Sequence, residues 1–424
     1  MNSPTGSEPP PSEADVVIIG AGIIGAACFY NLCAAGAGPS IGSGRGLRVV
    51  CLDRGGRAAG STSRSAAGFR HQFAAASSIA MSRLSGERYR AFPKVMGGDP
   101  VLDPVGYLFL YRDPGQWHGA EARVKIQHDA GVPEVERLTA DETVRRFPDV
   151  RRAGLLGATF CPLDGILRPE IVTSAYLDRG IALGGTLLPY RPVTGVRTEG
   201  GAVRAVVIGD REIRTRFLVN AAGPWANVLG TLAGCPVPVT PVKRYLYVTN
   251  QFTARDVSRG PFMIFDLEAY ARPEHRGLMI GWDLKPGKPD GWDRFPPPPV
   301  DHAGMNDAIE PGYGLGVEEW GYQVLTALAD WLPFLETEAG LEHVACGYYE
   351  VTPDEKAIIS RDPRLAGLVH VTGFSGHGVM HAPAAGEAVR DLVLDRTPPF
   401  PLEPFALEPL LRNEPRVDPE SVII

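Results

Sequence analysis

The feature that most constrains the fold is a glycine motif that separates two short apolar runs near the start of the chain. Val and Ile residues over Asp15–Ile19 predict a buried parallel strand, which Gly20–Gly25 follows directly. Ala26–Ala35 then has helical character, and a second Val-rich run over Leu47–Leu52 ends at Asp53. This order of strand, turn, helix and strand predicts a βαβ unit.

The turn of this unit has the GxGxxG spacing of a dinucleotide-binding loop, with glycine at positions 20, 22 and 25. Such a turn lets the backbone touch a pyrophosphate, whose charge the N–H groups at the helix N-terminus stabilise. Asp53 is expected to accept hydrogen bonds from a ribose. It follows the motif by more than the usual spacing of about 20 residues, which the Gly/Ser-rich loop Gly36–Gly46 explains. The alternative is a glycine-rich packing turn.

Composition narrows the class of protein. A chain of 424 residues predicts two domains, and an apolar fraction of 44% is ordinary for a soluble globular enzyme. The net charge of −7 argues against nucleic acid or an anionic membrane as the main partner. The six cysteines form no CxxC pair and no zinc-like spacing, so we expect reduced thiols and no metal. Val16–Tyr30 is too short to span a bilayer and has no basic flank, which predicts a cytoplasmic protein without a membrane span.

Two further motifs bear on the cofactor. Phe217–Trp225 is a predicted strand that ends in small residues, which would let the chain approach a flat cofactor, although an ordinary strand and turn fits it too. Gly373–Gly378 precedes a predicted helix over Ala382–Leu394, with Pro383 in its first turn. The N-terminus of that helix would stabilise a ring that becomes anionic on reduction. A second loop of this kind predicts FAD rather than NAD.

Taken together, these stretches resemble the D-amino acid oxidase superfamily, and within it the branch of sarcosine oxidases, glycine oxidases, dimethylglycine dehydrogenases and proline dehydrogenases. The resemblance covers nearly the whole chain. It rests on Val16–Gly25, Ser61–Phe73, Asp164–Gly165, Val219–Trp225, Tyr270–Gly281, Tyr348–Ile359 and Gly373–Gly386.

The resemblance implies an α/β plus α+β fold class: a Rossmann-like, glutathione-reductase-like FAD-binding domain with an inserted antiparallel-sheet substrate domain. The expected ranges are a disordered leader over 1–14, a discontinuous FAD-binding domain over 15–95, 155–235 and 340–396, a substrate domain over 96–154 and 236–339, and a C-terminal tail over 397–424.

The resemblance also implies where the cofactor binds. Ser61-Thr62-Ser63 would lie near the pyrophosphate, Gly376–Met380 along the isoalloxazine edge, and the backbone of Val193 at the adenine. The full set of expected cofactor-binding residues is Gly20, Gly22, Ile23, Ile24, Gly25, Asp53, Arg54, Ser61, Thr62, Ser63, Val193, Ala221, Ala222, Gly223, Trp225, Gly347, Gly373, Ser375, Gly376, His377, Gly378, Val379 and Met380.

The substrate side departs from monomeric sarcosine oxidases. Those enzymes carry a lysine at the position of Met279, which helps the reduced flavin react with oxygen, and another near Met380, which holds the substrate carboxylate. Without that second lysine, Arg70 is our leading candidate for the carboxylate, with Arg244 and Arg272 as alternatives. Arg70 could equally pair with a structural acid or a flavin phosphate.

Other candidates concern the flavin linkage and the pocket. Some relatives tether the flavin through a cysteine at the position of Gly347. Cys346 is one residue away and would face the other side of a strand, so we expect non-covalent FAD. His71 and Tyr270 are predicted pocket residues and His377 a flavin contact.

We therefore expect FAD-dependent oxidation of the C–N bond of a small amine or of a secondary or N-methyl amino acid. A hydride would pass to flavin N5, and the resulting imine would hydrolyse. Oxygen, or an electron-carrier protein or quinone, would then reoxidise the flavin. Two alternatives stay open: a flavoprotein kept as an assembly or interaction factor, and an NAD-only dehydrogenase.

Overall fold

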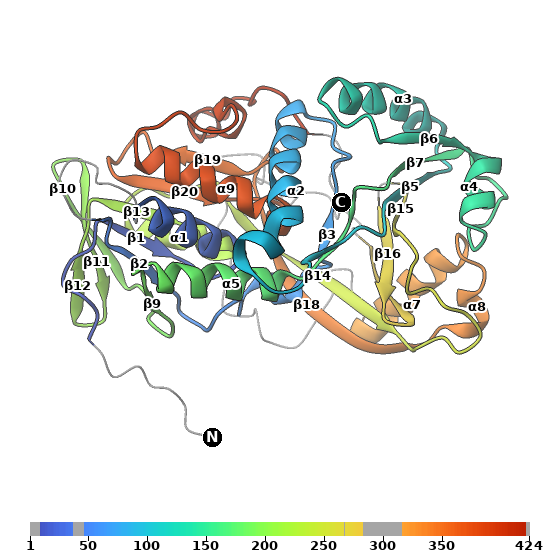
Figure 1. Ribbon diagram of the computed structural model, residues 1–424, viewed down its shortest axis with the longest axis horizontal. Coiled ribbons are helices and arrows are strands. Elements are labelled where there is room, and N and C mark those ends of the chain that lie inside the picture. The colour runs from blue at the N-terminus through green and yellow to red at the C-terminus, as the bar shows by residue number, and fades with distance from the viewer. Residues whose placement is uncertain (1–8, 37–45, 267, 283–315, 421–424) are drawn as a thin grey trace.

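The computed structural model describes residues 9–36, 46–266, 268–282 and 316–420 (Figure 1). The expectations for residues 1–8, for most of the loop Gly36–Gly46 and for the last residues of the tail lie outside the described residues. Two large sheets dominate the described part, one of six strands and one of eight. No described helix combines the length and the apolar character that crossing a membrane requires.

The six-stranded sheet holds the predicted βαβ unit at its centre. Its order is β19-β20-β13-β1-β2-β9, and all neighbours are parallel except β19 and β20. Along β1, Val16 and Ile18 pack on the helical side, whereas Val17 and Ile19 pack on the opposite side. Burial on both faces explains the unbroken apolar run. The strands are β1 (Val16–Ile19), β2 (Val49–Leu52), β9 (Thr186–Leu188), β13 (Phe217–Asn220), β19 (Ile358–Arg361) and β20 (Leu368–Thr372).

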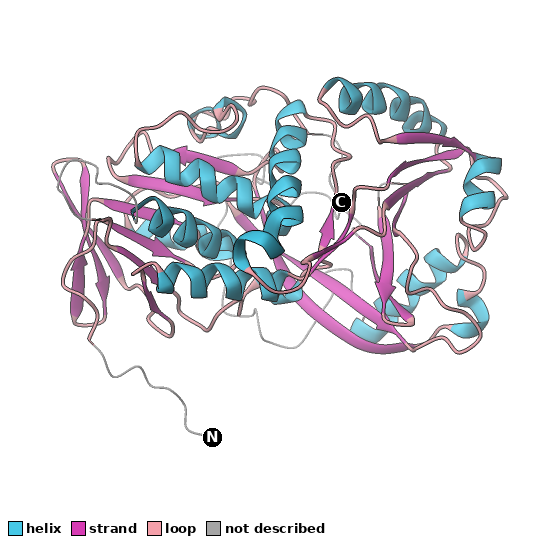
Figure 2. Ribbon diagram, viewed as in Figure 1, coloured by secondary structure: helices cyan, strands magenta, loops and turns pink. Residues whose placement is uncertain are grey.

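Helices cover one face of this sheet, where α1 packs between α5 and α9 (Figure 1, Figure 2). The apolar spacing of Leu177–Leu188 predicts one helix over this range. Instead α5 ends and the chain forms β9, because Gly184 between them takes a φ of +92°, which a helix does not allow. The helices on this side are α1 (Ile23–Gly36), α2 (Ala76–Met96), α5 (Pro169–Ala182) and α9 (Gly378–Val393), whereas α6 (Ala226–Leu232) packs on the opposite side through Leu229.

Helix α9 begins earlier than predicted, so Pro383 lies inside it and not in its first turn. A proline cannot donate to the carbonyl four residues before it, here that of Val379. The hydroxyl of Tyr89 on α2 donates to Val379 O in its place. A buried hydrogen bond between two helices thus compensates for the proline.

The eight-stranded sheet has the order β18-β14-β17-β16-β15-β5-β7-β6. Its neighbouring strands are antiparallel, except that β5 and β15 run parallel. These two strands come from stretches far apart in the chain, and they meet in the same direction. The strands are β5 (Tyr107–Tyr111), β6 (Glu136–Thr139), β7 (Gly157–Cys161), β14 (Thr240–Thr249), β15 (Phe262–Phe265), β16 (Ala269–Glu274), β17 (Gly277–Trp282) and β18 (Leu341–Val351).

Smaller elements complete the described fold. Helices α4, α7 and α8 lie around the outer side of the eight-stranded sheet (Figure 1). The remaining elements are β3 (Gly68–Phe69), β4 (Leu102–Asp103) and β8 (Gly165–Leu167) in one three-stranded sheet, β10 (Gly195–Glu199), β11 (Ala202–Ile208) and β12 (Arg211–Arg214) in another, the helices α3 (Pro114–Asp129), α4 (Ala140–Arg146), α7 (Val317–Ala329), α8 (Leu335–Glu338) and α10 (Glu408–Leu411), and the short 3₁₀ helices η1 (Ser61–Arg64), η2 (Gly223–Trp225) and η4 (Glu403–Phe405).

The C-terminal tail is integrated into the fold more tightly than its lack of periodicity suggests. Asp418 accepts hydrogen bonds from the N–H groups of Ala76 and Ser77, at 3.2 and 2.7 Å. Glu420 accepts from Ala74 and Ala75, at 2.9 and 3.1 Å. The N-cap residue of α2 is an alanine without a capping side chain, so two acids of the tail cap this helix instead.

We expect Asp418→Ala and Glu420→Ala each to lower the free energy of unfolding by about 1 kcal/mol, the usual cost of a lost helix cap. Thermal unfolding against wild type measures the loss, and Glu414→Ala, on an exposed side chain of the same tail, is the control. Against the opposing effect of burial, hydrogen bonds from Ser77 lower the pKa of Asp418. The contribution of Asp418 should therefore be present above the pKa of an unfolded aspartate and disappear as the pH falls through the folded pKa. Equal stability of wild type and both variants near neutral pH would contradict this role.

Candidate functional site

A cavity of about 690 Å³ lies where the carboxyl ends of β1, β2 and β13 meet one face of the eight-stranded sheet. Its volume is within the range of about 300–1,000 Å³ typical of cofactor and ligand sites. Ligands of parallel sheets bind outside the carboxyl ends of the strands, which is where this cavity lies.

The glycine turn forms one wall of the cavity. Gly20 has a φ of +114°, and a Cβ there would lie 2.2 Å from the carbonyl oxygen of Ala221. A Cβ at Gly25 would lie 1.8 Å from the carbonyl oxygen of Gly20. At Gly22 the nearest atom to such a Cβ would be Thr62 Oγ1, at 3.1 Å. Gly20 and Gly22 therefore leave backbone exposed to the cavity, which fits the pyrophosphate of a dinucleotide, and Gly25 lets the helix approach the turn closely.

Asp53 holds this turn in place. Its Oδ2 accepts from the N–H of Ala21 and its Oδ1 from the N–H of Gly55, both at 2.6 Å. Each carboxylate oxygen has a second lone pair, which leaves acceptors for a ribose. Arg54 and Trp225 line the cavity beside Asp53, and the guanidinium lies 5.2 Å from the centre of the indole ring.

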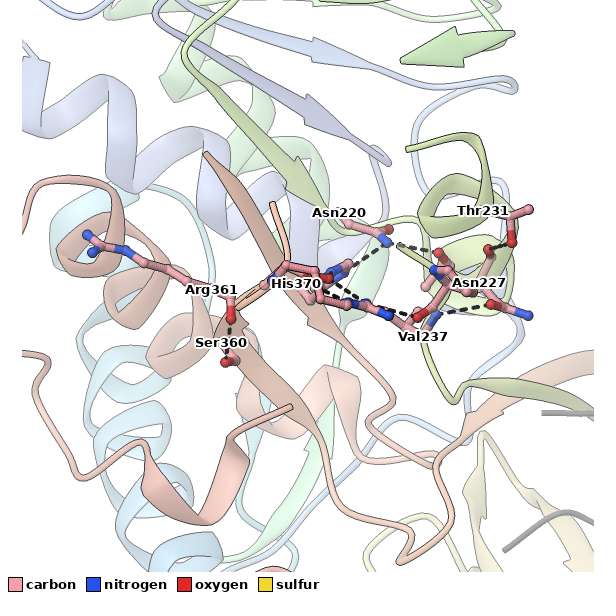
Figure 3. Close-up of polar contacts among 11 residues, drawn as sticks. Asn220, Asn227, Thr231, Val237, Ser360, Arg361 and His370 are labelled. Carbon is pink, nitrogen blue, oxygen red and sulfur yellow. Dashed lines mark hydrogen bonds and ion pairs between the residues drawn. The ribbon is translucent and has the colours of Figure 1, made fainter. Parts of the chain in front are cut away.

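The turn after β13, which contributes Ala221–Trp225 to the cavity, is fixed by a buried chain of hydrogen bonds (Figure 3). Asn220 donates to Ala226 O at 2.9 Å and to His370 Nδ1 at 3.2 Å, and His370 Nε2 lies 3.0 Å from Asp362 Oδ2. Burial lowers the pKa of His370, so a neutral ring that accepts from Asn220 and donates to Asp362 satisfies every partner.

The N-terminus of α9 forms another wall beside the glycine turn, since a Cβ at Gly378 would lie 3.8 Å from Ile24 Cγ1. Gly376, Gly378, Val379 and Met380 line the cavity, and Gly376 has a φ of +91°. A Cβ at Gly376 would lie 2.5 Å from the ring of Tyr349. The free N–H groups at this helix end give the wall a positive potential.

His377 does not line the cavity, which differs from its expected role as a flavin contact. Its Nε2 lies 3.0 Å from a guanidinium nitrogen of Arg70. Burial, and then the charge of Arg70, hold the pKa of His377 well below its usual range. His377 is thus a neutral acceptor for Arg70 behind the cavity wall.

Arg70, our candidate for the carboxylate, and His71, a predicted pocket residue, also lie outside the cavity lining. Arg70 is 1% exposed, and its guanidinium lies 4.4 Å from the centre of the Phe73 ring. His71 Nδ1 lies 2.6 Å from Asp164 Oδ1, which also accepts from the N–H of His71 at 2.9 Å. The segment after β3 turns into the core because this buried acid binds it there.

His71 and Asp164 form, with Cys161, a buried group of potential metal ligands whose atoms lie within 4.8 Å of one another. Burial raises the pKa of the Cys161 thiol, which disfavours the thiolate that would bind a metal. The short contact between His71 and Asp164 uses both of these groups already. The group is therefore explained by hydrogen bonding within the core.

Most predicted cofactor-binding residues meet at the cavity. Of the residues considered for the substrate side, Tyr270 lines the cavity, whereas Met279 does not and packs half-buried beside the aromatic cluster of β5 and β15. Gly25, Ser63, Gly373, Ser375 and His377 lie outside the lining. The predicted residues that line it are Gly20, Gly22, Ile23, Ile24, Asp53, Arg54, Ser61, Thr62, Val193, Ala221, Ala222, Gly223, Trp225, Gly347, Gly376, Gly378, Val379 and Met380.

Cys346 faces away from the cavity, as its offset from Gly347 predicts. Gly347 lines the cavity, whereas Cys346 packs against the core on the other face of the eight-stranded sheet. No cysteine of the described part of the chain belongs to the cavity lining.

The lining residues that the eight-stranded sheet contributes were not predicted, because no sequence motif marks them. The available signal was the alternation of side chains in strands such as Phe262–Phe265. The cavity-lining residues missed in this way include Tyr107, Leu246, Phe262, Ile264 and Glu350.

Glu350, at the end of β18, links the two sheets at the cavity. Its Oε2 accepts from the hydroxyl of Thr372 at 2.9 Å, and its Oε1 accepts from the N–H of Phe374 at 3.3 Å. Its carbonyl oxygen accepts from the N–H of Ser375 at 3.2 Å. Burial raises the pKa of Glu350 to about 7. This acid fixes the loop that leads into α9.

Comparison with known proteins shows matches over most of the chain. A family model described as FAD dependent oxidoreductase matches residues 15–392. FAD-dependent oxidoreductase domain-containing protein 1 of Xenopus laevis is 27% identical over 93% of this chain and 81% of its own length. Glycine oxidase of Bacillus licheniformis is 27% identical over 90% of this chain and 93% of its own. The crystal structure of L-proline dehydrogenase from P. horikoshii is similar with a TM-score of 0.82 and 26% identity, over 96% of this chain and all of that chain.

We expect Glu350→Ala to weaken FAD binding roughly 10- to 100-fold, the value of one or two hydrogen bonds to a charged group. Glu350→Gln should retain most of the affinity, because its amide can accept from Phe374 and donate to Thr372. Titration of the apoprotein with FAD, followed by fluorescence quenching, measures both. Glu342→Ala, at an exposed position of the same strand, is the control. Wild-type affinity in Glu350→Ala would show that the acid does not position the loop.

Proposed function

The chain belongs to the family of FAD dependent oxidoreductases, and from this premise we propose that it oxidises the C–N bond of a small amine or amino acid. As a member of that family it is an enzyme with FAD as its cofactor, so the NAD-only alternative is wrong. Two of its relatives are named as a glycine oxidase and an L-proline dehydrogenase. One observation carries the proposal: a single cavity of about 690 Å³ joins the glycine turn to the aromatic face of the second sheet.

The proposal extends to the domains. A Rossmann-like FAD-binding domain of the glutathione reductase type would comprise residues 15–95, 155–235 and 340–396, with a substrate domain over 96–154 and 236–339. Strands β7 and β18 belong to the eight-stranded sheet, so we assign them to the substrate domain despite those boundaries. The eight-stranded sheet would then roof the cofactor.

The residues that would hold FAD follow from the cavity. Asp53, Arg54, Val193 and Trp225 would contact the adenosine half, and the Gly20–Ile24 backbone with Ser61 and Thr62 the pyrophosphate. Gly376–Met380 would run along the ring, where the N-terminus of α9 offers N–H donors. FAD supplies the acceptor for the two electrons and the hydrogen of the substrate C–H bond. The absence of a described cysteine from the lining supports non-covalent binding.

Arg244 replaces Arg70 as the residue proposed to bind a substrate carboxylate. It lines the cavity from β14, and its guanidinium lies 5.3 Å from the centre of the Tyr349 ring. Its Nη1 donates to Lys243 O at 3.2 Å, which orients the group. Arg272 lies outside the lining and pairs with Glu274 at 2.6 Å. A guanidinium on the aromatic face would clamp a carboxylate while the amine nitrogen lies toward the ring.

We expect secondary and N-methyl amino acids, proline among them, to bleach the flavin band of the anaerobic protein. An air pulse should then separate the acceptors: rapid return of the band with peroxide indicates an oxidase, and slow return indicates a dehydrogenase with a carrier protein or quinone. Absence of bleaching with every amine tested would favour the alternative of an assembly or interaction factor.

We expect Arg244→Gln to raise KM for amino acid substrates roughly 10- to 100-fold, because a charge-assisted bidentate contact is lost. The corresponding amines without a carboxylate are the control substrates, and their KM should change little. Steady-state kinetics on matched pairs, such as proline and pyrrolidine, measure the difference. An equal effect on both members of a pair would place Arg244 outside the carboxylate site.

A further inference from the structure

We infer that the amino acid oxidised under the proposed function carries a bulky apolar group, ring or branched chain, and not the single hydrogen of glycine or a charged side chain. This inference rests on the proposed function for the reaction and on the wall of the cavity for the substrate. The wall is defined as Tyr107, Leu246, Phe262, Ile264 and Tyr270, all of them cavity-lining residues of the eight-stranded sheet.

The alternation of the strands separates this wall from the core of the sheet. On β15, Phe262 and Ile264 face the cavity side, whereas Met263 and Phe265 pack in the cluster that includes α7. On β16, Tyr270 faces the cavity side, between residues that pack on the other face. One face of the sheet is therefore an apolar surface shared with the cavity, and the other face is an ordinary core.

The wall is rigid because its rings pack on one another. Tyr107 and Phe262 are stacked with their centres 4.3 Å apart and an interplanar angle of 7°. The centre of the Tyr270 ring lies 6.0 Å from that of Phe262. Each ring is at most 5% exposed. A preformed apolar surface of this kind binds a complementary apolar group without an ordering cost.

Two glycines make room for this arrangement. A Cβ at Gly68 would lie 2.9 Å from the Phe262 ring and 3.1 Å from the Tyr107 hydroxyl. A Cβ at Gly281, the partner of Tyr270 across the strands, would lie 2.3 Å from the Tyr270 ring. Any side chain at position 68 or 281 would therefore displace these rings from the cavity.

The charges around the cavity fit the same class of substrate. The wall itself contains no ionisable acid or base of the Asp, Glu, Lys, Arg or His type. The charged residues that line the cavity lie outside this wall: Arg244 is on β14, the strand that also carries Leu246, and Glu350 is bound to Thr372 and Phe374. The others are Asp53, Arg54, Arg64 and Arg191. A charged substrate side chain against the wall would lose its hydration without a partner, whereas an apolar one would gain from burial.

A binding experiment on the FAD-loaded protein tests the inference separately from turnover. Carboxylates without an amine cannot be oxidised at a C–N bond, and their binding is followed as a change in the flavin spectrum. We expect phenylacetate and 3-methylbutanoate to bind at least about 10-fold more tightly than acetate, since each added methylene in an apolar pocket is worth roughly 10-fold. Succinate, which adds a second charge, should bind no better than acetate. Equal binding of acetate and phenylacetate, or tightest binding of succinate, would overturn the inference even if amines bleach the flavin.

Substrate preference gives a second test. Among N-methyl amino acids, kcat/KM should rise from N-methylglycine to N-methylleucine and N-methylphenylalanine, and N-methylaspartate should lie far below N-methylleucine. A preference for N-methylglycine would overturn the inference and leave the proposed function intact. Absence of bleaching with every member, together with the expected order of carboxylate binding, would instead overturn the proposed reaction.

A pair of variants tests whether the wall causes the preference for phenylacetate over acetate. Phe262→Ala should reduce the ratio of phenylacetate to acetate affinity roughly 10-fold while FAD content stays that of wild type. Val344→Ala, at a 39% exposed position on β18 of the same sheet, is the matched control and should keep the wild-type ratio. If Phe262→Ala fails to fold, Ile264→Val removes one methyl group from the same wall and should shift the ratio in the same direction. An unchanged ratio in a folded wall variant would contradict the assignment.

Discussion

The close approach of the glycine turn to the end of β13 is the constraint on which the rest of the structure depends. Gly20 lies against the carbonyl of Ala221 so closely that a Cβ would be 2.2 Å from it, and Gly25 lies as closely against Gly20. This contact brings the carboxyl ends of neighbouring parallel strands to one place, where Asp53 binds the turn from β2. Backbone N–H groups and small residues then face one cavity, and no larger residue could occupy these glycine positions without separating the strands.

The second sheet completes the cavity through β18. This strand pairs with β14 along the edge of the eight-stranded sheet, and its last residues reach the loop before α9. Glu350 accepts from Thr372 and Phe374 there, and the ring of Tyr349 fills the space that glycine leaves at position 376. One strand therefore fixes both the wall of the second sheet and the loop that directs the N-terminus of α9 into the cavity. A displacement of the second sheet would change the position of that helix end.

Features that depend on local chemistry could be predicted from the sequence. The turn of Gly20–Gly25, Asp53 at the end of the next strand and the glycines before α9 all follow from short-range rules, and all but Ala21, Gly25 and Gly373 line the cavity. The offset between Cys346 and Gly347 is also local, because successive side chains on a strand face opposite sides. Resemblance extended these predictions to Val193 and Ser61, which no local rule would have selected.

Features that depend on distant partners could not be predicted. Arg70 looked suited to a substrate carboxylate, but its position depends on His377, and that of His71 depends on Asp164. Pro383 fits within α9 because Tyr89, from another helix, supplies the missing donor. The wall of Tyr107, Phe262 and Tyr270 requires strands from separate stretches to become neighbours. No pattern within one stretch contains that information.

The charge states of the buried groups behind α9 determine the electrostatic potential in the cavity near neutral pH. Burial and the charge of Arg70 keep His377 neutral, and burial lowers the pKa of His381 to about 3. Burial lowers the pKa of Arg70, but a guanidinium is not deprotonated in proteins, so Arg70 stays charged. These groups therefore keep their charge near neutral pH, and the positive potential at the N-terminus of α9 would favour negative charge on a reduced flavin ring. Glu350, with a pKa of about 7, is then the cavity-lining acid positioned to change charge near neutral pH, and it does so at the hydrogen bonds that hold the α9 loop.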